Sequence, residues 1–173
     1  MANPTMTLIS SQVLGSTAST VTFSSIPQTY SNLKLVSSSR ADGGGSNDAI
    51  EMQFNSDTTT NYSWTYLISS SGSASSGRTS NNPYFGQIII DGSASTSNVF
   101  GSADIYISNY TLSSTKQLIS FSTQENNSAT AASIWLIAQY YRGTSPITSI
   151  TLIANGDNFI ANSSFYLYGI KNS

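Results

Sequence analysis

The sequence predicts an all-β protein, a two-sheet antiparallel β-sandwich of jelly-roll type with ten or eleven strands. Short alternating or apolar runs are interrupted about every 10 to 15 residues by Gly, Asn, Asp, Pro or Ser. No run keeps the apolar period of a helix. Serial short strands at this spacing are typical of sandwiches and barrels. Because the strands fill the chain, we expect residues 1–173 to form a single β-sandwich domain.

The first half of the chain contains six predicted strands and two predicted loops. The run that ends at Phe54 alternates most cleanly, with Ile50 and Met52 on the same face. Ala41 to Asn47 is a predicted loop with three consecutive glycines, and Ser69 to Asn82, the segment of lowest complexity, is predicted to be a mobile loop. The expected strands are Thr5 to Leu14, Thr20 to Phe23, Asn32 to Ser39, Asp48 to Phe54, Tyr62 to Ile68 and Tyr84 to Ile90.

The second half contains five further predicted strands. Ser133 to Tyr141 has apolar side chains on both faces, which predicts a central strand covered on both sides. A helical turn is the alternative there, because two alanines precede it. Asn155-Gly156-Asp157 is a tight-turn signal before the last strand. The expected strands are Val99 to Ser108, Lys116 to Thr123, Ser133 to Tyr141, Ile147 to Ala154 and Ser163 to Lys171.

The composition excludes several classes of partner. The chain has 36 Ser, 19 Thr and 15 Asn, but 11% aromatic residues and a net charge of -2 favour a folded domain over disorder. Its six basic residues are scattered, which argues against nucleic-acid binding. No stretch approaches the roughly 20 apolar residues of a membrane helix. The N-terminus lacks the basic and apolar regions of a secretory signal, so we expect neither a signal nor a membrane partner.

The chain has no histidine and no cysteine, which removes most catalytic groups. Serine–histidine triads, cysteine nucleophiles, and imidazole or thiolate metal sites are all excluded. Of the eight acidic residues, only Glu51 and Asp104 lie in predicted strands, and most of the others lie in turns. We therefore expect no enzyme and no cofactor. A glycan-active enzyme of the depolymerase type is the remaining catalytic alternative, and it needs two carboxylates that face each other in a cleft.

Two weaker signals concern ligands. Asp42 to Asp48 resembles an oxygen-rich calcium loop, but it lacks the alternating ligands and distal Glu of an EF-hand, so a flexible glycine-rich connection is preferred and no metal is expected. Aromatic rings can stack on sugars, although on half-buried strands they are usually core or cross-strand pairs. The available rings are those of Tyr62, Trp64, Tyr66, Tyr84, Tyr140 and Tyr141.

Protein–protein contact is the remaining option. Interface cores are enriched in Tyr and Trp and depleted in most charged residues. Only 8% of this chain is charged, and its many small polar side chains form hydrogen bonds at little desolvation cost. The composition therefore favours an extensive, fairly polar interface with identical neighbours.

Four segments, in their order and spacing, resemble a group of small all-β virion proteins of tailed bacteriophages. The resemblance extends particularly to phages of cyanobacteria and other aquatic bacteria, and it covers nearly the whole chain. No single segment is a chemical motif. The segments are Phe23-Ser-Ser-Ile-Pro-Gln-Thr-Tyr30 followed by Leu33-Lys-Leu35, Phe54-Asn-Ser-Asp-Thr-Thr-Thr-Asn-Tyr62, Ile105-Tyr-Ile-Ser-Asn-Tyr110, and Ser164-Phe-Tyr-Leu-Tyr-Gly-Ile-Lys171.

The resemblance implies a structural protein of the virus particle. It favours a capsid decoration (cement) protein, made in the host cytoplasm and located on the outer surface of the capsid, which binds the major capsid protein as a homotrimer. The segment Met1 to Thr7 is the expected anchor, with Asn3, Pro4 and Thr5 as the candidate capsid-anchoring residues. The alternative is a tail-fibre or receptor-binding domain that recognises host-surface glycan.

Overall fold

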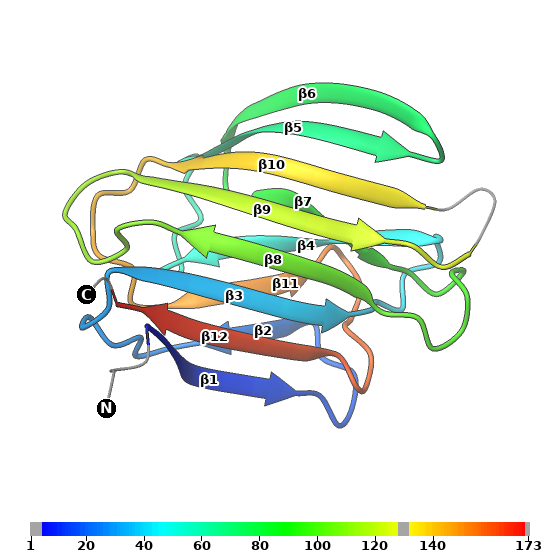
Figure 1. The fold of residues 1–173 in the computed structure, drawn as a ribbon, viewed down its shortest axis with the longest axis horizontal. Coiled ribbons are helices and arrows are strands. Elements are labelled where there is room, and N and C mark those ends of the chain that lie inside the picture. Colours follow the sequence, from blue (N-terminus) through cyan, green and yellow to red (C-terminus); the bar gives the residue numbers. More distant parts are fainter. Residues whose placement is uncertain (1–4, 128–131, 172–173) are drawn as a thin grey trace.

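A computed structural model describes residues 5–127 and 132–171. These residues form twelve β-strands and no helix, and the strands build two antiparallel sheets that pack face to face (Figure 1). The predicted fold class is confirmed: the chain is a two-sheet antiparallel β-sandwich of jelly-roll type. Within the described residues, no helix has the length and apolar character needed to span a membrane.

The larger sheet has eight strands in the order β1-β12-β3-β8-β9-β10-β5-β6. Every neighbouring pair is antiparallel, and β1 and β6 are the edges. Most neighbours in this sheet are distant in sequence, so the order cannot be read from local turns. The strands are β1 (Met6–Val13), β3 (Asn32–Ser39), β5 (Tyr62–Ser70), β6 (Ser73–Asn82), β8 (Gly101–Ile107), β9 (Lys116–Gln124), β10 (Ser133–Tyr141) and β12 (Ser164–Ile170).

The smaller sheet has four strands in the order β2-β11-β4-β7 and lies behind the larger sheet in the view of Figure 1. Because it has half as many strands, it leaves part of the larger sheet uncovered. The hairpin β5–β6, at the top of Figure 1, extends past the edge strand β7. The strands are β2 (Thr20–Phe23), β4 (Asn47–Phe54), β7 (Phe85–Asp91) and β11 (Ile150–Ala154).

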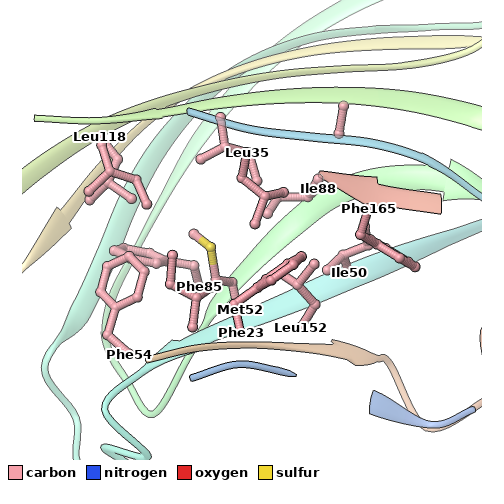
Figure 2. Close-up of a cluster of buried hydrophobic side chains, with 14 of the residues drawn as sticks. Phe23, Leu35, Ile50, Met52, Phe54, Phe85, Ile88, Leu118, Leu152 and Phe165 are labelled. Carbon is pink, nitrogen blue, oxygen red and sulfur yellow. The ribbon is translucent and has the colours of Figure 1, made fainter. Parts of the chain in front are cut away.

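The core lies between the two sheets and is built by alternation. In β4, Ile50, Met52 and Phe54 are fully buried, as their spacing predicts (Figure 2). Phe54 packs edge-on against Phe85, with ring centroids 5.7 Å apart. Leu35 of the larger sheet belongs to the same core cluster and lies across the sandwich from these side chains. Burial of one such side chain contributes about 1.5–3 kcal/mol.

The prediction of a mobile loop from Ser69 to Asn82 is wrong, and this accounts for the extra strand. The segment contains the end of β5, a two-residue turn and all of β6. The φ angles of Ser71 and Gly72 are 48° and 84°, as in the turns that join tightly paired strands. Small Ser, Thr and Gly side chains gave no apolar signal, but an edge strand pairs through its backbone and needs none.

The prediction that β10 is covered on both faces is also wrong. Its position is central, between β9 and β5, and Ile137 points into the core. The side chains of Ile134, Leu136 and Tyr140 lie on the other face, which is exposed. An apolar strand therefore carries part of its apolar surface to the outside of the molecule.

Candidate functional site

The predicted anchor residues fall at the start of the described chain. Asn3 and Pro4 lie outside the described residues. Thr5 is exposed, and its backbone carbonyl accepts a 3.0 Å hydrogen bond from the backbone N–H of Lys171. Thr5 is therefore attached to the folded body, at the edge where β1 pairs with β12.

The six aromatic residues that could have stacked on sugars separate into three groups. Tyr62 and Tyr141 are core residues, with ring centroids 4.9 Å apart. Tyr140 lies on the exposed outer face of the larger sheet. The other three, Trp64, Tyr66 and Tyr84, lie near the edge strand β7, beside the uncovered part of the inner face.

A cleft lies beside the edge strand β7, and we call it the inner cleft. It consists of two adjoining hollows of about 380 and 250 Å³, which share Ala49, Gln87 and Asn155 as lining residues. Side chains from both sheets and from the 155–157 turn meet here. The lining residues whose acidic, amide or aromatic side chains could contact a ligand include Asp48, Glu51, Trp64, Tyr84, Gln87, Trp135, Asn155 and Asp157.

Aromatic rings form one side of the inner cleft. Trp135 packs against Tyr66, with ring centroids 5.6 Å apart and planes tilted by 40°. Tyr66 can lie there only because its cross-strand neighbour is Gly77, where any Cβ would collide with the Tyr66 hydroxyl. The ring of Trp64 lies against Gly86 of β7. Neither indole N–H, on Trp64 or on Trp135, has an acceptor among the described residues.

Carboxyl groups lie at the other end of the inner cleft, away from the aromatic rings. The side chains of Asp48 and Asp157 converge over Gly43, where a Cβ would collide with both. Burial raises the pKa of Asp48 to about 6, and the charges of Asp157 and Asp42 act in the same direction. Asp42 instead accepts hydrogen bonds from the backbone and side chain of Asn158, which lower the pKa of Asp42.

The glycine-rich segment that resembled a calcium loop is tied to the 92–94 segment. The carbonyl oxygens of Gly43 and Gly45 accept backbone hydrogen bonds of 2.8 and 3.0 Å from Ser93 and Ala94. Among the described residues, no group of three or more His, Cys, Asp or Glu is placed to hold a metal ion. The segment leads directly into β4, whose second residue is Asp48.

Gln87 occupies the point that the two hollows share. The register of β4 with β7 changes between Ile50 and Met52, so that Gly86 and Gln87 together oppose Glu51. Gln87 has a φ of 72°, a conformation rarely adopted by a residue other than Gly. The bulge places Gln87 against both hollows. Nothing in the sequence pattern marks Gln87, because a single polar residue in an apolar run carries no signal of a bulge, and Asn155 was predicted only as a turn residue.

Glu51 and Tyr84 lie in the smaller hollow and hydrogen-bond to each other. Burial raises the pKa of Glu51, and the hydrogen bond from Tyr84 opposes that change. The other strand acid, Asp104, lies on the outer face and forms a 2.7 Å ion pair with Lys34. Only one of the two strand acids therefore belongs to the cleft.

The carboxyl groups of Asp48 and Asp157 can be compared with those that a glycan-active enzyme would need. Asp48 and Asp157 do face each other in a cleft, as that alternative requires. Carboxyl groups that cleave a glycosidic bond stand about 5–9.5 Å apart to leave room for the reacting atoms. The two carboxyl oxygens that crowd the same point over Gly43 lie less than about 5 Å apart, at or below the short end of that range.

The exposed face of the larger sheet carries a second feature, which we call the outer apolar patch. Leu136 lies directly opposite Leu67 on one side and Phe121 on the other. These three side chains are 43%, 58% and 44% exposed. They enclose a shallow hollow of about 310 Å³ whose lining contains no charged residue. The patch consists of Leu67, Ile119, Phe121, Ile134, Leu136 and Tyr140.

No protein-family model matches this chain, and no curated protein matches it. Several solved structures are similar. An exo-inulinase from Aspergillus awamori is 13% identical with a TM-score of 0.49, over 95% of this chain but only 29% of the inulinase. A galectin from Caenorhabditis elegans is 8% identical with a TM-score of 0.36, over 99% of both chains. Scytalido-glutamic peptidase is 13% identical with a TM-score of 0.31, over 87% of this chain and 75% of the peptidase. These similarities concern the fold.

Proposed function

We propose that this chain is a non-enzymatic structural protein of a bacteriophage particle, a capsid decoration protein that binds the major capsid protein on the outer surface of the shell. The sequence resemblance is the reason to propose a phage particle. The outer apolar patch supports a role in assembly, because Leu67, Phe121 and Leu136 form one exposed row across three strands.

The patch has the properties of a contact surface. Contiguous exposed apolar surface on a soluble protein commonly marks an interaction site. Each of these side chains is about half exposed, so its burial against a partner would contribute on the order of 1 kcal/mol. Such a contact is weak for one copy. Repeated over several linked subunits, it becomes strong through avidity.

Self-association into a homotrimer is the second part of the proposal, and we place that contact at the β1 edge. Unpaired edge strands invite further pairing, and closure within an oligomer covers them. Met6, Leu8 and Val13 of β1 are all exposed. The proposed anchor residues Asn3, Pro4 and Thr5 come directly before this strand.

The experiment combines copy number with a binding assay. Gel densitometry and cryo-electron microscopy of purified particles should find hundreds of copies, with density on the shell. The double variant Leu67→Ser/Leu136→Ser should lose binding to shells that lack the protein, whereas Gln117→Ser, an exposed polar site on the same face, should bind normally. Tens of copies on a tail fibre would contradict the proposal and favour the receptor-binding alternative.

A further inference from the structure

We infer that the inner cleft binds an uncharged sugar, with Trp135, Gln87 and Asn155 as its principal contacts. This inference does not depend on a role in capsid decoration, since the cleft and the outer apolar patch lie on opposite faces of the larger sheet. It rests on four properties of the cleft: its size, its charge, its hydrogen-bonding groups and its rings.

The cleft is a built feature of the fold. The larger hollow, about 380 Å³, falls within the range of about 300–1,000 Å³ for small-molecule sites. Gln87 lines both hollows, and its backbone has a left-handed conformation that residues other than Gly rarely adopt. A strained polar residue at a bulge beside a cleft is a recurrent property of binding sites.

The charge of the cleft selects against anionic ligands. Of the described residues that line the two hollows, none is a lysine or an arginine. Asp48, Glu51 and Asp157 supply carboxyl groups instead. A phosphate, sulfate or carboxylate would meet like charge and no cation to pair with. Nucleotides, acidic glycans and sulfated glycans are therefore disfavoured.

The hydrogen-bonding groups favour a ligand that both donates and accepts hydrogen bonds. An ammonium group only donates, whereas a hydroxyl group does both. The hydroxyl groups of a sugar can donate to the carboxyl groups of Asp48, Glu51 and Asp157 and can exchange hydrogen bonds with the amides of Gln87 and Asn155.

Rings and amides provide the remaining contacts. Trp135 is half-buried, and its contact with Tyr66 fixes its ring at the side of the larger hollow. A flat ring of this kind covers the C–H face of a pyranose without requiring a charge. Gln87 and Asn155 each carry one donor group and one acceptor, which suits the vicinal hydroxyls of a sugar. Ring, amides and carboxyls thus surround one volume.

The two tryptophans of the chain are Trp64 and Trp135, so tryptophan signals report directly on the cleft. The full chain is titrated with maltotriose, cellotriose, laminaritriose, N-acetylchitotriose and mannotriose, and in parallel with cationic chitosan trimer and anionic trigalacturonate. Indole N–H resonances and tryptophan fluorescence are recorded. We expect at least one neutral trisaccharide to shift both indole resonances below 10 mM and to bind more tightly than either charged trimer.

Variants then test the contacts. Trp135→Ala and Gln87→Gly should each weaken binding at least tenfold, whereas Tyr140→Ala on the outer face should leave it unchanged. Trp135→Phe keeps a ring in place and serves as the variant that retains the fold, with a smaller loss. The inference is overturned if no neutral trisaccharide shifts an indole resonance, if a charged trimer binds more tightly, or if Trp135→Ala binds normally.

The two proposals fail separately. Leu67→Ser/Leu136→Ser should lose shell binding and keep sugar binding, and Trp135→Ala should do the reverse. Loss of both activities in a variant with an unchanged melting temperature would contradict the separation of the two faces.

Discussion

The hydroxyl of Tyr141 donates a 2.8 Å hydrogen bond to Oδ2 of Asp57 and so joins the end of β10 to the turn that follows β4. Asp57 also accepts hydrogen bonds from the backbone N–H of Thr59 and the side chain of Asn61. Burial alone would raise the pKa of Asp57, but these hydrogen bonds outweigh it and lower the pKa to about 2. One ionised side chain thus fixes the turn between two strands of different sheets.

Loss of Asp57 should destabilise the protein in a pH-dependent way. Asp57→Ala removes the acceptor of at least three hydrogen bonds, and we expect a loss of about 1–3 kcal/mol in the free energy of unfolding at pH 7. Because the folded pKa lies below the ordinary value of 3.8, this contribution is present above about pH 4 and is lost as the pH falls through 2. Urea denaturation at pH 7 and at pH 2 measures the difference.

Asp104→Ala is the matched control, because the ion pair of Asp104 with Lys34 is on the surface and contributes about 0–1 kcal/mol. If both variants lost the same stability at pH 7, the Asp57 network would not have the role assigned to it.

Asp48 should show the opposite dependence on pH. Its folded pKa, about 6, lies above the ordinary value, so the protonated side chain stabilises the fold below about pH 4 and that contribution is lost as the pH rises through 6. Asp48→Asn removes the ionisation and keeps an oxygen that can accept from the backbone N–H of Ala49. We expect the melting temperature to rise by a few degrees at pH 8, and by less at pH 5. Asp104→Asn should give no such rise, and a lower melting temperature for Asp48→Asn at pH 8 would refute the argument.

Arg40 should be sensitive even to replacement by lysine. It is 6% exposed, and its guanidinium donates to the carbonyl oxygens of Ser93, Ser95, Thr96 and Val99. An ammonium group is a single point donor and cannot span four acceptors. We expect Arg40→Lys to lose about 2–3 kcal/mol in urea denaturation. The exposed Arg142 gives the control, Arg142→Lys, for which we expect less than about 0.5 kcal/mol; similar losses in both variants would contradict the prediction.

Alternation and turn chemistry were enough to predict much of the fold. Ile50, Met52 and Phe54 face the core as their spacing indicates, and Gly156 of the Asn-Gly-Asp signal has a φ of 82°. Local pattern failed where the backbone alone specifies the pairing, as in β6. It also failed in β10, because apolar content does not say which face another sheet covers.

The inner cleft could not be predicted from the sequence, for a different reason. It depends on the bulge that pairs Gly86 and Gln87 with Glu51 and on the meeting of Asp48 with Asp157, which are 109 positions apart in the numbering. Neither the register of two strands nor a contact over that separation leaves a mark in the local pattern. Trp64, Tyr66 and Tyr84 were predicted as candidate rings, but Trp135 was not.

Gly77 should be the glycine that matters most to the aromatic side of the cleft. A Cβ at this position would collide with the hydroxyl and ring of Tyr66, which must then move against Trp135. We expect Gly77→Ala to destabilise the fold by about 1–3 kcal/mol, as overpacking does, and to shift the tryptophan fluorescence. Gly44→Ala is the control, because a Cβ on Gly44 meets only open space. If Gly77→Ala left both stability and fluorescence unchanged, Tyr66 would not be held between β6 and Trp135, and the inner cleft would lose the ring contact on which its shape depends.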